Sequence, residues 1–214
     1  MDLTQTAPTG LRELKKQETR QLISDHATRL FIAQGFEQTT IAEIATAARV
    51  AKKTVTNYFA RKEDLALDHQ DAFVATLAET VAARSPGESA LAALRRGFEQ
   101  AVATQDPVTG FAGLEFTRMI ADSPTLTTCL RGLHDQREQA LRETLAEAVG
   151  EPSDSITVHT AAALLGAVHR TLFDRIQHLT LSGRTNDEIA SLIAPEGAQA
   201  FDLLDPALGD YAVR

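Results

Sequence analysis

The sequence predicts an all-α protein in which an N-terminal three-helix unit of the helix-turn-helix type precedes a larger helical bundle. Three observations support this fold class. Apolar residues recur at helical spacing almost throughout, and no run of alternating β-branched residues marks a strand. The 12 glycines and 7 prolines of the 214 residues include the breakers that separate the periodic segments. We expect about nine helices.

The first helix is expected over about residues 11–34, after a flexible tail at residues 1–10. Ile23, Ala27, Leu30 and Phe31 have the spacing of one helix face. Gly35 then provides a residue that tolerates the conformation in which helices commonly end. These residues predict one long amphipathic helix.

Two short helices should follow. Thr40 begins the sequence Thr-Ile-Ala-Glu, a capping box in which the Thr40 hydroxyl and the Glu43 carboxylate each accept a backbone N–H. A helix is therefore predicted over about 41–48. After a break at 49–51, Val55 and Phe59 lie four residues apart on one side of a third helix over 52–59.

Longer helices are predicted in the rest of the chain, separated by Pro and Gly breakers. Ser85-Pro86-Gly87 is the strongest of these stops, because proline lacks the N–H and glycine permits a turn. The residues after Pro195 are mixed in character, with 201–204 as a candidate for a last short helix. The expected helices cover residues 62–84, 88–104, 110–122, 125–149, 155–181 and 185–193.

Charge divides the chain into two parts. The net charge is −8, which alone argues against a polyanionic partner. Residues 1–62, however, contain ten Lys and Arg against six Asp and Glu, a net charge of +4, whereas residues 63–214 contain 11 against 23, or −12. We expect a domain boundary here, with a basic module over 1–62 and an acidic body over 63–214. Chance segregation of solvated charge is the alternative explanation.

The two short helices have the size and spacing of a helix-turn-helix, whose second helix enters the major groove of DNA. No acidic residue occurs between Ile44 and Lys62. Helix 52–59 carries donors and small polar groups suited to phosphates and base edges. An ordinary exposed polar helix is the alternative. The candidate contact residues on this helix are Lys52, Lys53, Thr54, Thr56, Asn57 and Tyr58.

Residues 35–65, GFEQTTIAEIATAARVAKKTVTNYFARKEDL, resemble the N-terminal signature of the TetR family of bacterial transcription regulators. The shared pattern is Gly-aromatic, Thr-Thr, Ile-Ala, a turn, Thr-x-x-x-Tyr-Phe and Lys-x-x-Leu. With the first helix included, the resemblance covers about 50 residues. It implies a regulator that binds operator DNA as a homodimer.

The resemblance also implies residue roles. Thr40 and Tyr58 would touch the DNA backbone, Lys62 would contact a phosphate, and the other polar residues of helix 52–59 would face the groove. Three positions depart from the family pattern, which usually has Gly at Arg49, Ser at Ala51 and Tyr at Thr56. Ala at an N-cap costs about 1 kcal/mol relative to Ser. Arg49 could add a phosphate contact, although a solvated turn arginine fits the sequence equally well.

The dimer interface is expected on the C-terminal helix pair, because helix 155–181 has an apolar surface broad enough for more than one neighbour. In the family this pair forms a four-helix interface across a two-fold axis. The alternative is that the same side chains fill only the protomer's own core. The candidate interface residues are Leu164, Leu165, Val168, Leu172, Ile176 and Ile189.

The resemblance further implies a ligand cavity in the acidic body, and we expect a small hydrophobic or amphipathic effector that releases a repressor from its operator. For each aromatic or Met residue a core role is favoured over a pocket role. Arg118 is a further candidate polar anchor. The candidate lining residues are Phe111, Phe116, Met119, Leu130, Leu133, His134, Arg137, His169 and Phe173.

Several other function classes lack support in the sequence. No Gly-x-Ser-x-Gly, phosphate-binding Gly loop, His-Glu-x-x-His or paired Cys motif occurs, so neither an enzyme nor a cofactor is expected. His134 with Glu138, and Asp174 with His178, have a spacing that suits metal ligands, but they are interpreted as surface pairs.

Features that the sequence lacks indicate where the protein is located. The longest apolar run, Ala161–Val168, is too short for a membrane span. The start MDLTQTAPTG does not resemble a secretory signal, and the single Cys129 cannot form an internal disulfide. A cytoplasmic location is therefore expected. A helical interaction protein with a regulator-like head and no operator specificity is the remaining alternative.

Overall fold

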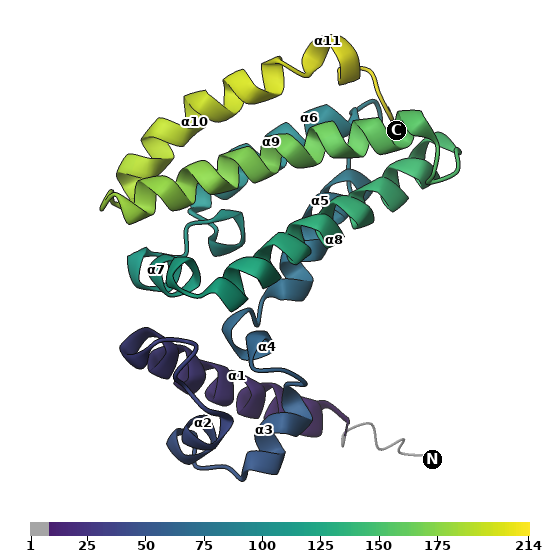
Figure 1. Ribbon diagram of the computed structural model, residues 1–214. Coiled ribbons are helices and arrows are strands. Elements are labelled where there is room, and N and C mark those ends of the chain that lie inside the picture. Colours follow the sequence, from purple (N-terminus) through teal and green to yellow (C-terminus); the bar gives the residue numbers. More distant parts are fainter. Residues whose placement is uncertain (1–8) are drawn as a thin grey trace, which may run out of the picture. The chain divides into compact units, whose positions relative to one another are not determined.

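The computed structural model describes residues 9–214, which contain helices and no strand, so the predicted all-α class is confirmed (Figure 1). Thr9 and Gly10 belong to the first helix, and the prediction of a tail through residue 10 is wrong for these two residues. The rest of the predicted tail, residues 1–8, lies outside the described residues. No helix in 9–214 has both the length and the hydropathy that crossing a bilayer requires.

The described chain forms two compact units. The first contains the residues up to Asp68 together with Asp122–Leu126, and the second contains His69–Ala121 and Thr127–Arg214.

The first unit is built on α1 (Thr9–Gln34), with α2 (Ile41–Ala47), α3 (Lys52–Tyr58) and the single-turn α4 (Glu63–Ala66) packed around it. The predicted capping box at the start of α2 is confirmed: the Thr40 hydroxyl accepts the Glu43 N–H, and the Glu43 carboxylate accepts the Thr40 N–H. Its core consists of aliphatic and aromatic side chains from the four helices and the links between them, including Ile23, Ala27, Phe31, Phe36, Ile44, Val55, Phe59 and Leu65.

The second unit contains the remaining helices. They are α5 (Gln70–Ala82), α6 (Ala90–Thr104), the 3₁₀ turn η1 (Pro107–Thr109), α7 (Leu114–Asp122), α8 (Pro124–Val149), α9 (Ile156–Leu181), α10 (Asn186–Asp202) and α11 (Asp205–Leu208). Long helices α9 and α10 lie side by side, and α6 packs against α10 (Figure 1). The last residue of α7 and the first three of α8 belong to the first unit.

The single helix predicted over 62–84 is wrong, because α4 and α5 are separate helices with a break at residues 67–69. Leu65 and Ala66 of α4 are buried in the first unit, whereas Phe73 and Leu77 of α5 are buried in the second. The apolar residues of α4 and α5 are buried in different cores, but in the sequence their spacing is continuous and resembles that of one long amphipathic helix.

The helix predicted to begin at Gly110 instead begins at Leu114. Gly110 and Gly113 have φ values of 122° and 81°, in the region that favours glycine. The chain at 107–113 is therefore a 3₁₀ turn followed by an irregular link.

The predicted end at Ile193 is also wrong, because α10 continues through Pro195 to Asp202. Proline removes one helical N–H donor. Packing beyond it preserves the helix: Gly197 and Phe201 are buried, and Glu196 pairs with Arg175 of α9 at 2.9 Å. The last short helix is α11 rather than 201–204.

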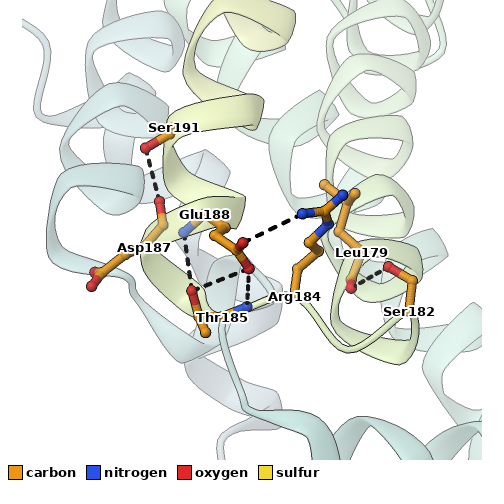
Figure 2. Close-up of polar contacts among 7 residues, drawn as sticks. All are labelled: Leu179, Ser182, Arg184, Thr185, Asp187, Glu188 and Ser191. Atoms are coloured by element: carbon orange, nitrogen blue, oxygen red, sulfur yellow. Dashed lines mark hydrogen bonds and ion pairs between the residues drawn. The ribbon is translucent and has the colours of Figure 1, made fainter.

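The turn between α9 and α10 shows why the new helix begins where the sequence predicts (Figure 2). Thr185 and Glu188 form a second capping box, in which Glu188 accepts the Thr185 N–H at 2.9 Å. Arg184 also pairs with the Glu188 carboxylate at 3.3 Å.

Candidate nucleic-acid interface

Helix α3 has one buried side and one polar, exposed side. Val55 and Phe59 are only 0% and 3% exposed, and they anchor the helix in the core of the first unit. Thr54 and Tyr58 are half-buried. The side chains of Lys52, Lys53, Thr56 and Asn57 are exposed, so the polar groups predicted to face DNA are available to a partner.

Two of the positions that depart from the family pattern, Arg49 and Ala51, lie in the turn before α3. Arg49 has a φ of 55°, a left-handed conformation that glycine adopts without steric cost, which is why glycine is usual there. Ala51 occupies the N-cap of α3, and no side chain caps this helix start. The exposed Arg49 side chain lies immediately before the polar helix.

Arg20 of α1 holds the end of α3. Its guanidinium donates to the Tyr58 carbonyl at 2.9 Å and lies over the Phe59 ring, 4.3 Å from the ring centroid. A cation over an aromatic face contributes about 0.5–1 kcal/mol at a partly exposed site. Arg20 therefore links α3 to α1, a role that the sequence analysis missed.

Lys62 has a comparable position on the other side of the unit. Its ammonium donates to the carbonyls of Phe36 and Thr39 at 2.9 and 3.2 Å, and it lies 4.2 Å from the Phe36 ring centroid. A weaker contact at 3.4 Å joins it to the Glu37 carbonyl. The side chain expected to meet a phosphate is thus directed at the link between α1 and α2.

The Thr40 hydroxyl is exposed, but it is already bonded within the capping box. It donates to the Glu43 carboxylate at 2.8 Å and accepts the Glu43 N–H at 3.2 Å. The hydrogen bond from the Thr40 backbone N–H is the main cause of the lowered pKa of Glu43, which stays ionised. A DNA phosphate contact through Thr40 would compete with this carboxylate.

A groove beside α3 adds basic residues that the sequence analysis did not assign to the site. Asn57 and Tyr58 form one side of it, and the N-terminal part of α1 forms the other. Lys15 and Lys16 are among the five lysines of the chain, and this clustering was the available signal. The groove is lined by Arg12, Glu13, Lys15, Lys16, Thr19, Asn57 and Tyr58.

Comparisons with known proteins agree with this geometry. Residues 23–68 match the family of bacterial regulatory proteins described as the tetR family. Over 169 residues, 76% of this chain and 75% of the relative, the sequence is 28% identical to the HTH-type transcriptional regulator TcmR of Streptomyces glaucescens. The N-terminal unit of the chain therefore contains a helix-turn-helix region that matches the tetR family.

Solved structures of other proteins share the fold of this chain. A putative TetR-family regulator from Syntrophomonas wolfei superposes with a TM-score of 0.57 at 18% identity, covering 87% of this chain and 96% of that one. A complex of SmeT with triclosan gives a TM-score of 0.56 at 18% identity, with coverage of 91% and 94%. These likenesses show a shared fold, and the sequence match at residues 23–68 assigns the tetR-family helix-turn-helix to the N-terminal unit.

Most of the candidate ligand residues lie in the interior of the second unit. Phe111, Met119, Leu133 and Phe173 are buried, whereas Phe116 and Leu130 are half-buried and Arg118 is exposed. None of these seven lines the cavity of about 90 Å³ in this unit. The structure brings together His134, Arg137 and His169, which are all buried and all line it.

The candidate dimer residues fall into two groups. Leu165, Leu172, Ile176 and Ile189 are buried in the protomer's own core, at most 3% exposed. Val168 is partly buried against that core, and Leu164 is 38% exposed. Further exposed apolar side chains of the helix pair, which the sequence analysis did not select, are Ile156, Leu181 and Leu192.

The two pairs with metal-ligand spacing have different surroundings. Asp174 and His178 are exposed, whereas His134 is buried and is not the surface residue expected. No cluster of three or more His, Cys, Asp and Glu side chains suited to a metal occurs in the described part of the chain.

Proposed function

We propose that this protein is a TetR-family repressor that binds a palindromic operator as a homodimer and is released by a small hydrophobic or amphipathic effector. The single observation that carries the DNA-binding part is the two-sided character of α3. Val55 and Phe59 hold it in place, while Lys52, Lys53 and Asn57 are exposed on it.

Within this face the side chains have different tasks. Lysines suit phosphates, which provide affinity and salt dependence for every sequence. Asn57 is suited to bidentate contact with an adenine edge, and Thr56 suits a base or a thymine methyl group. We therefore assign positioning on DNA to Lys52, Lys53 and the α1 lysines, and sequence choice to Thr56 and Asn57. Arg49 and Tyr58 complete the proposed backbone contacts.

A binding assay at fixed salt tests operator recognition. The protein should bind a duplex from its own promoter region at least about a thousandfold more tightly than a scrambled duplex of equal length. Asn57→Ala should reduce this ratio while leaving the affinity for scrambled DNA unchanged. Gln100→Ala, at an exposed position in α6, is the matched control. Equal affinity for the two duplexes would favour a helical interaction protein without operator specificity.

The proposed dimer interface uses the exposed apolar residues of α9 and α10 rather than the buried ones. Leu164 and Leu192 are 38% and 41% exposed. Their replacement by glutamate should dissociate the dimer in sedimentation experiments, because two charges would be buried at the interface. Leu114→Glu is the control, since Leu114 of α7 has a similar exposure of 36%. A double variant that stays dimeric would refute this interface.

The effector response is supported by the cavity of about 90 Å³ between α5, α8 and α9. A ligand that binds the DNA-incompetent conformation more tightly shifts the population away from DNA, by as much as its affinities for the two conformations differ. One protein of this fold has been solved in complex with triclosan. Release of operator DNA by a compound that saturates the cavity would support the response.

A further inference from the structure

The cavity in the second unit combines an apolar setting with unusual polar groups. It is lined by residues of α5, α8 and α9: Leu77, His134, Arg137, Glu138, Gly166, Ala167, His169 and Arg170. Phe73 and Phe173 pack edge-on against the His134 ring at 5.0 and 5.1 Å. A second group, Phe98 and Phe201, packs against the His169 ring at 6.1 and 5.5 Å.

Arg137 is a buried cation that forms no ion pair within the described chain, although the charge of Asp106 acts on it. Arg137 is only 4% exposed, and its guanidinium makes no hydrogen bond or ion pair with any residue in 9–214. The guanidinium lies 4.6 Å from the centroid of the Phe73 ring, and its Nε is buried without a partner. Removing a charge from water without a partner costs several kcal/mol, so the protein's own packing does not explain this residue.

The pKa values are consistent with an interior that holds one positive charge. Burial lowers the pKa of Arg137 to about 10, with Asp106 acting in the opposite direction, so the side chain stays protonated at neutral pH. Burial also lowers the pKa of His134 to about 4 and that of His169 to about 3. The charges of Arg170 and then Arg137 add to the lowering at His134, and the charge of Arg137 adds to it at His169. Both imidazoles are neutral, and each has a buried Nε2 without a hydrogen-bond partner.

We propose that this cavity is a carboxylate site, in which Arg137 pairs with the carboxylate of a small organic acid and His134 and His169 bond its oxygens or the atoms next to them. The guanidinium matches the planar, bidentate geometry of a carboxylate. A neutral imidazole can donate or accept one hydrogen bond through Nε2, depending on its tautomer.

The size and charge of the cavity define the ligand class further. A volume of about 90 Å³ is well below the roughly 300–1,000 Å³ of drug-sized pockets. It holds a carboxylate and a few attached carbon atoms. Glu138 also lines the cavity, with its carboxylate near Gly166, and would repel a second negative charge. The ligand is therefore a compact monocarboxylate with an apolar body.

The site deepens the proposed effector response and depends on it only for the consequence at DNA. Calorimetric titration of the full chain without DNA tests the site itself, with acetate, propionate and butyrate as probes and the corresponding amides as neutral controls. The acids with an apolar body should bind at least tenfold more tightly than their amides. Arg137→Gln should abolish this preference, and Arg118→Gln, at an exposed arginine in the same unit, should preserve it. Equal binding of acid and amide by the wild type, or no binding of any acid, would overturn the proposal.

Stability provides a second readout that does not require a ligand. Arg137→Met replaces the uncompensated charge by an apolar chain of similar length, so the unligated variant should unfold at the same temperature as the wild type or higher. A midpoint lowered by several degrees would identify Arg137 as a structural residue and contradict the proposal. A carboxylate that binds but leaves operator affinity unchanged would refute the effector role and leave the site itself standing.

Discussion

At the scale of single residues, two lysines near the recognition helix have different surroundings although the sequence presents them alike. Lys53 is exposed on α3. The ammonium of Lys62 donates to backbone carbonyls and lies over the Phe36 ring. Lys53 is therefore a candidate DNA contact, whereas Lys62 stabilises the link between α1 and α2.

Substitution of each lysine by methionine tests this separation. Lys62→Met should lower the free energy of unfolding by about 2 kcal/mol, because charge-assisted hydrogen bonds and a cation–π contact are lost. Lys53→Met should leave stability unchanged, weaken binding to every duplex and reduce the salt slope by about 0.9. Urea unfolding and salt titrations measure the two effects. A stable Lys62→Met variant with the binding defect of Lys53→Met would restore Lys62 as a phosphate contact.

The two buried histidines predict how stability depends on pH. Above pH 6.5 both histidines are neutral in the folded and in the unfolded chain. Below pH 6.5 the histidines of the unfolded chain become protonated. In the folded chain they stay neutral until about pH 4 for His134 and about pH 3 for His169. The unfolding free energy should therefore fall with decreasing pH, by up to about 1.4 kcal/mol per pH unit for each histidine. Denaturant unfolding at pH 6.5 and pH 5 measures this loss.

His169→Gln should reduce the loss of unfolding free energy between these two pH values, because the unfolded variant has one histidine fewer to protonate. His159→Gln, at an exposed position, is the control. An equal loss in the wild type and in His169→Gln would contradict a neutral, buried His169.

Some residue roles could be predicted from the sequence and others could not. Val55, Phe59 and the Thr40–Glu43 capping box follow from local spacing, and the structure places them as expected. The burial of Arg137 and the contacts of Lys62 depend on side chains far away in the sequence, such as Phe73 and Phe36. No local pattern encodes them.

At the scale of helices, α10 shows how tertiary packing prevails over a local stop signal. Pro195 favoured an end near residue 193, yet the helix continues because its later residues pack against α6 and α9. The break at 67–69 illustrates the reverse case, since the apolar period continues across it while the chain passes from one core to another. Helical periodicity alone does not predict in which of the two cores the apolar face of a helix is buried.

Gly197 tests the contact between α10 and α6. A Cβ at this position would overlap with Cε1 of Phe98. Gly197→Ala should therefore lower the free energy of unfolding by about 1–3 kcal/mol. Gly132→Ala, in α8 where nothing lies within 4 Å, should be neutral or stabilising because alanine is the better helix former. Denaturant unfolding compares the two variants, and equal effects would contradict the close approach of Phe98.

At the scale of the whole molecule, a basic helix-turn-helix is joined to an acidic helical body. The division of charge, +4 in residues 1–62 against −12 in residues 63–214, favours approach to DNA through the N-terminal unit alone. The proposed dimer would present α3 twice, and two-fold symmetry in the protein would be mirrored in the operator. Dimer formation and DNA recognition are thus parts of one hypothesis.

The most direct measurement is the selection of bound duplexes from a random pool by the wild type and by Asn57→Ala. The wild type should enrich a palindrome of two half-sites, because α3 would read each half once per protomer. Asn57→Ala should relax the sequence at one matching position in both half-sites. A pool without enrichment, or a single unpaired half-site, would contradict recognition of duplex DNA by two copies of α3.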